Sequence, residues 1–426
     1  MSFTPIEDIL DGRCEGKRIS VRGWIYRKRE SKDIVFFIMR DATGIVQCTV
    51  RKGSSAWADA KRVTIESSAT LSGTVKKDER APGGFEVSVD QLKIVGLAET
   101  FPITKDQSEE FRRNVRHLWL RSRRMNTIMK VRSETLRFVH EFFRKKSFIE
   151  VSPPMFISSA CEGGATLFGL KYFDKDLYLT QSAQLHLEAL IQSLEKVYCV
   201  APSFRAEKSR TIRHLAEYWH VEAEEAFSTM DDLICLEEDL VSHVCQNVAK
   251  QCRKELKTLE VDAGKLAKVK APFNRITYDE AVEKLRKKSF KIKWGEDFGF
   301  NEEKALAEEL GPLFVYAYPK KIKAFYCKTY RENPEMVMSV DLIVPNIGEL
   351  STGGAREDNK EFLLKRLEEF GLRQEDYEWY IDLRRYGTVP HTGFGLGVER
   401  LLAWMLDLEN IMDTIPFPRT VRRFYP

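Results

Sequence analysis

The sequence predicts an α+β protein in which a small N-terminal β-barrel precedes a larger region of mixed helices and strands. Three features of the 426 residues support this prediction. Five β-rich runs fall within residues 18–94, a charged strand–loop–strand occupies 204–227, and a glycine-rich strand leads into a helix at 391–405. A chain of this length has room for roughly three domains.

The composition is that of a globular protein with sizeable cores, since 43% of the residues are hydrophobic. The net charge of +4 is mildly basic and permits contact with RNA. No apolar run is long enough to span a membrane, and the first residues lack the pattern of a signal peptide. The eight cysteines form no Cys-x-x-Cys, so we expect reduced thiols, no structural zinc and a cytoplasmic location.

The N-terminal β-rich runs are short and separated by turn signals at Asp41-Ala-Thr-Gly44 and Pro82-Gly-Gly84. The runs are 18–26, 34–39, 45–50, 64–75 and 85–94. Five short strands in about eighty residues suit an OB-fold barrel, which binds oligonucleotides. Phe36 and Phe37 alternate, so one of them faces the core and the other can stack on a base. Alternation alone leaves open which one does so.

A connector and a long helix follow the barrel. Residues 98–126 carry dense mixed charges and suggest a hinge, or alternatively a solvated helix. The apolar spacing from Asn126 to Lys146 predicts an amphipathic helix. It ends at Ser147, and the chain then continues to Pro154. Farther on, 231–255 has a helical pattern, 256–300 is lysine-rich and interpreted as an insertion, and 314–326 and 336–344 are predicted strands.

The strand–loop–strand from Phe204 to Phe227 concentrates polar side chains on one face. Arg205 and Glu207 share a face of the first strand. Those on the second strand are Tyr218, His220, Glu222 and Glu224. The loop between them adds the basic residues Lys208, Arg210, Arg213 and His214. Such a face is costly to bury unless it binds something, so we expect phosphate at the tip and a polar ligand on the floor. A solvated edge hairpin is the alternative, although aromatic residues among the charges argue against it.

Two further stretches carry chemistry. Asp341 and Glu349 flank a turn, and Ser351-Thr-Gly-Gly-Ala-Arg356 follows; carboxylates beside hydroxyls and an arginine suit a Mg²⁺–triphosphate site. In His391-Thr-Gly-Phe-Gly-Leu-Gly397 the glycines are interpreted as packing a strand closely against the next helix, with Arg400 in its first turn, where the helix dipole favours phosphate. The Gly-x-Gly-x-Gly spacing differs from that of a dinucleotide-binding turn.

These motifs together resemble those of class II aminoacyl-tRNA synthetases. Phe204-Arg-Ala-Glu207 with Arg213-His214 resembles the second signature motif, the helix and strand ending at Pro154 resemble the first, and 391–405 resembles the third. The order of all three is far more specific than any one of them. The match is to the aspartyl/asparaginyl subgroup and covers nearly the whole chain. Ser147 departs from it, because the family commonly has glycine there.

The resemblance implies an organisation and a reaction. Residues 1–100 would be an OB-fold anticodon-binding domain, 101–125 a hinge, and 126–426 a catalytic domain with an antiparallel sheet flanked by helices and an insertion at about 250–300. The enzyme would activate an amino acid with ATP and Mg²⁺ and transfer it to the 3′ end of tRNA. The 126–154 region would form a homodimer.

The resemblance also implies site residues. ATP would be bound by Arg205, Glu207, Arg213, His214, Tyr218, Glu349 and Arg400, with Arg205 and Arg400 as the catalytic cations. The amino acid would be bound by Glu162, Ser182, Gln184, Glu188, Glu222 and Arg356. Mg²⁺ would be bound by Asp341, Glu349 and Thr352. Anticodon bases would be contacted by Arg29, Phe36, Gln47 and Glu86.

Two positions favour asparagine, and therefore tRNA(Asn), over aspartate. The aspartyl enzymes carry a lysine where this chain has Leu187 and an aspartate where it has Glu222. A glutamate without that lysine repels a carboxylate but accepts from an amide. Arg356 would donate to the amide oxygen, and Glu188 is the second choice for the acceptor. The stretch 380–391 also closely resembles the asparaginyl enzymes.

Three alternatives remain from the sequence. One is an aspartyl enzyme, including one that charges both tRNAs, against which Leu187 argues. Another is a tRNA-independent asparagine synthetase paralogue, which would lack the barrel. The last is a non-catalytic RNA-binding protein, which would have no need of Arg205, Glu349 and Arg400.

Overall fold

The computed structural model describes residues 2–159, 161, 166–207 and 214–426. They form two compact units that divide between Arg112 and Arg113. Among these residues no helix combines the length and the apolar character needed to cross a membrane.

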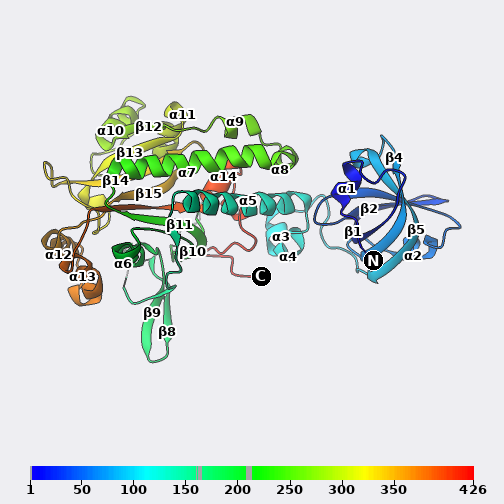
Figure 1. The fold of residues 1–426 in the computed structure, drawn as a ribbon, viewed down its shortest axis with the longest axis horizontal. Helices are drawn as coiled ribbons and strands as arrows, with labels where there is room; N and C mark the ends of the chain where they lie inside the picture. Colours follow the sequence, from blue (N-terminus) through cyan, green and yellow to red (C-terminus); the bar gives the residue numbers. More distant parts are fainter. Residues whose placement is uncertain (1, 160, 162–165, 208–213) are drawn as a thin grey trace. The chain divides into compact units, whose positions relative to one another are not determined.

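The first unit is a closed β-barrel with the strand order β1-β2-β3-β5-β4, as the β-rich runs predicted (Figure 1). Its strands are β1 (Arg18–Glu30), β2 (Ile34–Arg40), β3 (Ile45–Arg51), β4 (Ser68–Lys77) and β5 (Phe85–Gly96). Short helices that the sequence did not suggest accompany them: α1 (Ile6–Leu10), α2 (Trp57–Arg62) and η1 (Pro82–Gly84). Phe37 lies in the barrel core with 1% of its surface exposed, so Phe36 is on the outer face.

The second unit is built on a sheet of order β12-β13-β14-β15-β16-β11-β10-β6. The strands are β6 (Ile149–Glu150), β10 (Lys196–Phe204), β11 (Glu217–Ala226), β12 (Asn274–Thr277), β13 (Leu313–Pro319), β14 (Met336–Val344), β15 (Gly348–Ala355) and β16 (His391–Gly397). The central pairs are antiparallel, whereas the β6–β10 and β12–β13 pairs at the two edges are parallel. The expected antiparallel sheet is therefore mixed at its edges. A small sheet of β7 (Phe156–Ile157), β8 (Gly169–Tyr172) and β9 (Lys175–Leu179) projects from the unit (Figure 1).

Two long helices cover one face of the large sheet, α5 (Arg123–Lys145) and α7 (Met230–Gln251), and they run side by side (Figure 1). Ser122 caps α5, and a capping box of Thr229 and Asp232 starts α7. The other helices are α3 (Glu109–Asn114), α4 (Arg116–Trp119), α6 (Gln184–Leu194), α8 (Arg253–Leu259), α9 (Ala263–Ala267), α10 (Tyr278–Lys287), α11 (Phe300–Leu310), α12 (Lys360–Glu369), α13 (Glu378–Arg385) and α14 (Val398–Met405). Short 3₁₀ turns are η3 (Lys320–Ile322), η4 (Gln374–Tyr377) and η5 (Ile411–Asp413).

Two stretches differ from the sequence expectation. Part of the expected hinge is fixed within the second unit, since buried Arg116 donates to the carbonyl oxygens of Met412, Ile415 and Pro416. The lysine-rich stretch 256–300 is more regular than expected. Its strand β12 extends the large sheet and its helix α10 packs in a hydrophobic cluster, because apolar residues are spaced between the lysines.

Ser147 ends α5 in the left-handed region, with φ at 63°. Glycine adopts this conformation without steric cost, whereas a residue with a Cβ is less comfortable there. The backbone at this position therefore has the conformation that glycine serves best, although the chain carries serine.

Candidate active site

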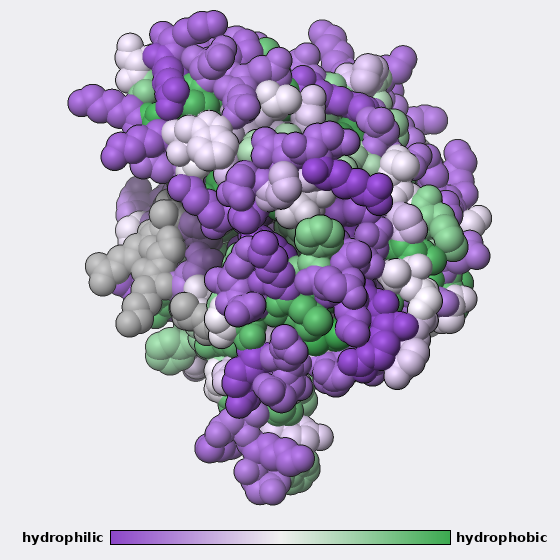
Figure 2. All heavy atoms as spheres, turned by 90° about the vertical axis from the view of Figure 1, so that its left-hand side faces the viewer, coloured by the Kyte–Doolittle hydropathy of each residue, from purple (hydrophilic) through white to green (hydrophobic). Residues whose placement is uncertain are grey.

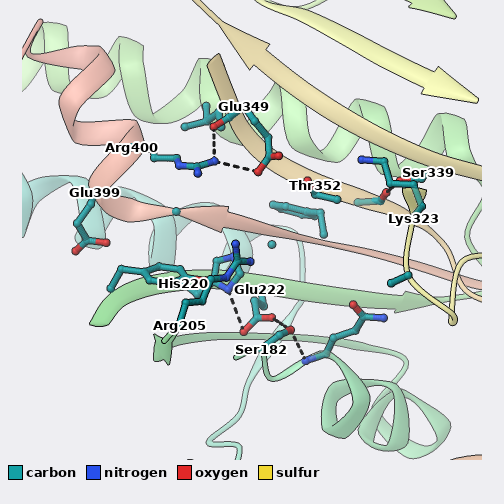
Figure 3. Close-up of a pocket in the computed structure, with 18 of the residues that line it drawn as sticks. Ser182, Arg205, His220, Glu222, Lys323, Ser339, Glu349, Thr352, Glu399 and Arg400 are labelled. Carbon is teal, nitrogen blue, oxygen red and sulfur yellow. Dashed lines mark hydrogen bonds and ion pairs between the residues drawn. The ribbon is translucent and has the colours of Figure 1, made fainter. Parts of the chain in front are cut away.

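A cavity of about 260 Å³ lies among the β10–β11 hairpin, strands β15 and β16, and the first turn of α14 (Figure 3). The predicted site residues that line it are Ser182, Gln184, Arg205, Glu207, His214, Tyr218, Glu222, Glu349, Thr352, Arg356 and Arg400. Asp341 and Glu188 are not part of the lining. Glu162 and Arg213, like Lys208 and Arg210, lie outside the described residues.

The glycines of β16 make room for side chains of the neighbouring strand β11. Gly393 pairs with Glu224, and a Cβ on this glycine would lie 2.0 Å from the Glu224 carboxyl carbon. A Cβ on Gly395 would lie 2.6 Å from Nε2 of His220. The sequence reading assigned these glycines to packing between strand and helix. Gly393 and Gly395 instead make room within the sheet, Gly393 for the buried carboxylate of Glu224 and Gly395 for His220, which lines the cavity.

Cations gather at the end of the cavity nearest α14. Nη1 of Arg400 donates to the backbone oxygen of Glu349 at 2.7 Å and to its Oε1 at 2.9 Å. The guanidinium of Arg205, just beyond β10, lies 5.7 Å from the ring centre of Tyr218. Two anchored guanidinium groups at one end of a concave site form a receptor for phosphate oxygens.

Carboxylates lie next to these cations. Burial would raise the pKa of Glu349, but Arg400, Lys323 and Arg205 hold it below its usual range. Burial raises the pKa of Asp341, although Lys323 pairs with it at 2.5 Å and opposes this effect. Burial and the charge of Glu349 raise the pKa of Glu303 to about 8. Negative charge is therefore crowded here and would be stabilised by a bound cation.

Lys323 and Glu303 belong to this end of the site, and neither was predicted from the sequence. Lys323 lines the cavity, and Glu303 accepts a hydrogen bond from the backbone nitrogen of Glu349. No local signal marked them, because Lys323 stands in a run of lysines and Glu303 in an ordinary amphipathic helix.

The oxygen donors fit a magnesium ion better than a metal that prefers nitrogen or sulfur. Asp341, Glu349 and Thr352 supply only hard oxygen atoms. Within the described residues no group of three or more His, Cys, Asp or Glu side chains is arranged around a metal position. Mg²⁺ often takes only one or two carboxylates, with the remaining positions filled by water and substrate phosphates.

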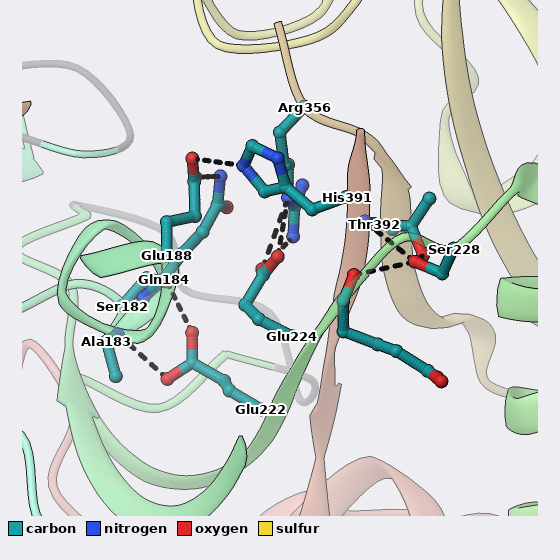
Figure 4. Close-up of polar contacts among 12 residues, drawn as sticks. Ser182, Ala183, Gln184, Glu188, Glu222, Glu224, Ser228, Arg356, His391 and Thr392 are labelled. Carbon is teal, nitrogen blue, oxygen red and sulfur yellow. Dashed lines mark hydrogen bonds and ion pairs between the residues drawn. The ribbon is translucent and has the colours of Figure 1, made fainter. Parts of the chain in front are cut away.

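The opposite end of the cavity is organised by Glu222 (Figure 4). Its carboxylate accepts from the hydroxyl of Ser182 and, at 2.9 Å, from the backbone nitrogen of Ala183, immediately before α6. His220 lies 3.6 Å away on the same face of β11. Glu222 therefore presents a fixed negative charge to the cavity, with only 3% of its surface exposed.

Arg356 lies on the same side and is held by Glu224. Its Nη2 lies 2.5 Å, and its Nε 3.2 Å, from Oε1 of Glu224. Burial raises the pKa of Glu224 to about 7, even though Arg356 opposes the shift. This pairing fixes the Arg356 guanidinium, and because Arg356 and Glu222 both line the cavity, the cavity offers a hydrogen-bond donor and an acceptor (Figure 4).

Leu187 and Glu188 are both behind the cavity. Leu187 is fully buried in a cluster with Ala183 and Cys199. Glu188 is fully buried as well, and its carboxylate contacts protein groups. The structure thus brings Glu222, rather than Glu188, to the surface that a ligand would touch.

The four residues suggested to contact bases share the outer face of the barrel. Arg29 pairs with Phe36 across β1 and β2, and Gln47 pairs with Glu86 across β3 and β5. The amide nitrogen of Gln47 donates to Glu86 at 3.2 Å. An outward aromatic ring beside groups that can read base edges has the composition of a single-strand binding surface.

The face of the molecule in Figure 2 is mainly hydrophilic, and its hydrophobic residues form small groups.

Family models match both units. The model described as tRNA synthetases class II (D, K and N) matches residues 108–421, and the OB-fold nucleic acid binding domain matches residues 19–95. An asparagine–tRNA ligase from Thermococcus gammatolerans is 50% identical over 97% of both chains.

Similar solved structures include further asparaginyl-tRNA synthetases. The asparaginyl-tRNA synthetase from Pyrococcus horikoshii, complexed with asparaginyl-adenylate, has a TM-score of 0.97 at 45% identity and is covered fully in both chains. The Entamoeba histolytica asparaginyl-tRNA synthetase, also with asparaginyl-adenylate, has a TM-score of 0.89 at 33% identity over 97% of each chain.

Proposed function

The chain belongs to the class II tRNA synthetases of the D, K and N group, and from this premise we propose that it attaches asparagine to tRNA(Asn) at the expense of ATP. The observation that carries the proposal is the end-to-end similarity to a synthetase bound to asparaginyl-adenylate, together with a cavity that offers cations at one end and an amide-matching pair at the other. The proposal places the enzyme in the cytoplasm, where translation occurs.

The reaction has two steps. A carboxylate oxygen of asparagine attacks the α-phosphorus of ATP, forming asparaginyl-adenylate as the bond to pyrophosphate breaks. A ribose hydroxyl at the 3′ end of the tRNA then attacks the activated carbonyl and releases AMP. Neither step requires a protein nucleophile, so the enzyme acts by positioning the reactants and neutralising charge.

The geometry supports the following roles. Arg205 faces the α-phosphate, where negative charge builds up as the new bond forms. His214 and Arg400 bind the terminal phosphate, and Tyr218 supports the adenine with Glu207 accepting from its amino group. The proximity of Arg205 to Tyr218, and of His214 to Glu207 at 3.8 Å, is consistent with one bent nucleotide touching all of them.

Asp341, Glu349 and Thr352 would hold Mg²⁺. When bound, the ion would neutralise charge on the phosphates. In the chain itself Asp341 pairs with Lys323 and Glu349 with Arg400, so each of these carboxylates is already held beside a cation.

The test is ATP–pyrophosphate exchange with each of the twenty amino acids. Exchange with asparagine alone is the expected result. Exchange with aspartate at a comparable rate would favour an aspartyl enzyme, and no exchange with any amino acid would favour a non-catalytic protein.

Anticodon recognition by the barrel gives a separate prediction. Phe36→Ala should lower the rate of tRNA charging about 5- to 150-fold, as expected for the loss of one base–aromatic stack of ~1–3 kcal/mol. Amino-acid activation should be unchanged, since Phe36 and the cavity lie in different compact units. Val95→Ala, at an apolar position of the barrel that is 65% exposed, is the control. An equal loss of activation and charging would argue against the stacking role.

We also propose a homodimer formed through the 126–154 region. Apolar side chains within it or just after it are exposed: Ile149 at 45%, Met155 at 48% and Phe156 at 51%. Light scattering at micromolar concentration should give twice the chain mass of 49.4 kDa. Phe156→Glu should reduce that mass, whereas Phe362→Glu, at a 53% exposed position on α12, should not. A fully active monomer would contradict the proposal.

A further inference from the structure

The carboxylate of Glu188 is surrounded by polar groups behind the amino-acid end of the cavity, and Figure 4 shows two of them, Gln184 and His391. Oε1 accepts from Nε2 of Gln184 at 3.0 Å, and Oε2 accepts from Nη2 of Arg384 at 2.6 Å. The hydroxyl of Tyr380 lies 2.9 and 2.7 Å from the two oxygens, and Nε2 of His391 lies 2.9 Å from Oε2. Four groups from α6, α13 and the start of β16 thus converge on one side chain.

This cage of polar groups leaves Glu188 no capacity to bind substrate. A carboxylate has about four acceptor positions; Gln184, Arg384 and Tyr380 donate to its oxygens, and the ring of His391 closes the remaining side. The side chain is also fully buried and is not part of the cavity lining. Burial by itself would raise the pKa of Glu188, but Arg384 and His391 hold it well below its usual range. The group is therefore an anion that can only accept hydrogen bonds.

An acceptor in this position determines the orientation of the Gln184 carboxamide. Gln184 lies one helical turn before Glu188 on α6 and lines the cavity. Its carboxamide has one donor end and one acceptor end. Because Glu188 can only accept, it binds the NH₂ end, and the carbonyl oxygen is the end left for the cavity. Among the described residues no side chain or backbone group donates to that oxygen.

We propose that Glu188 is a positioning residue: it fixes the Gln184 carboxamide so that its carbonyl oxygen accepts from an N–H group of the bound asparagine. The inference rests on the proposed function and deepens it. The same cage steadies the other side of the pocket, since Nε of Arg384 donates to the backbone oxygen of Glu357, the residue after Arg356. One buried anion thus connects the segments that carry Gln184 and Arg356.

The decisive variants are Glu188→Gln and Glu188→Asp. In Glu188→Gln the new oxygen pairs with Arg384, and the new NH₂ faces Gln184, whose carboxamide must then turn its own oxygen away from the cavity. The KM for asparagine should rise about 10- to 100-fold, as expected when a buried polar contact is lost, while the KM for ATP stays within about 3-fold. Glu188→Asp retains the charge, and its shorter side chain withdraws from Gln184. Glu188→Gln leaves the buried Arg384 without its ionic partner, which is destabilising. If that variant does not fold, Glu188→Asp tests the same rise in the KM for asparagine.

A double-mutant cycle separates positioning from a general structural role. Gln184→Met removes the carboxamide at similar volume. If Glu188 acts through Gln184, neither Glu188 variant raises the KM for asparagine further in the Gln184→Met background. Additive effects, or equal rises in the KM for asparagine and for ATP, would overturn the proposal. Glu195→Gln makes the same charge change at the exposed C-terminal end of α6 and should change neither KM. The activity of the wild-type protein with asparagine tests the proposed function separately.

Discussion

Arg400→Ala and Arg205→Ala should each reduce adenylate formation to the limit of detection while the protein remains folded. Charge-assisted contacts to a phosphate in a desolvated site are worth roughly 2–5 kcal/mol, or about 30- to 5000-fold in rate. Arg400 is held in place at two points by Glu349, so its guanidinium needs little reordering when ATP arrives. Preorganised charge of this kind stabilises a transition state more than a mobile side chain does.

Pyrophosphate exchange at saturating asparagine measures the effect, and thermal unfolding checks the fold. Arg373→Ala is the matched control, because it removes an arginine that is 74% exposed and paired with Asp376 on the surface. Arg400→Lys retains the charge but loses the planar fork, and we expect it to recover only part of the activity. Near-normal pyrophosphate exchange by Arg400→Ala would show that Arg400 does not bind ATP.

The parts of the fold predicted correctly from sequence are those specified by local patterns. Alternating apolar residues and turn signals located the barrel strands, because these features depend only on near neighbours in the chain. The hairpin around Arg205 and Glu222 was visible for the same reason, since both of its strands lie in one contiguous stretch. Which of Phe36 and Phe37 faces the core required the structure, because alternation has two possible phases.

The remaining site features depend on contacts between distant segments. Lys323 reaches Asp341 only because β13 and β14 are neighbours in the sheet. Gly393 is required by Glu224, which precedes it by more than a hundred residues and pairs with it across β11 and β16. A local pattern carries no information on such pairs, which explains why the cage around Glu188 also had no sequence signal.

Specificity for asparagine should depend on the charge of Glu222. Aspartate would bring a second carboxylate next to it in a buried site, and like charges at that distance are strongly unfavourable. A pocket matched to one polar partner can reject a mismatched analogue by roughly 10⁴-fold. Leu187→Lys by itself is not expected to make the pocket accept aspartate, because Leu187 is buried in an apolar cluster and a lysine there would have to be desolvated.

Glu222→Gln is therefore the sharper variant. The use of asparagine should fall about 5- to 150-fold, since a buried donor loses its charged acceptor at ~1–3 kcal/mol. The exchange rate with aspartate should fall less or rise, because the repulsion between Glu222 and the aspartate side chain is removed. The preference for asparagine over aspartate should therefore become smaller. Glu225→Gln makes the same change three residues later on β11, where Glu225 pairs with Lys196. It should leave the preference for asparagine over aspartate unchanged. Pyrophosphate exchange with both amino acids decides the matter: an unaltered ratio in Glu222→Gln would show that discrimination comes from elsewhere in the pocket.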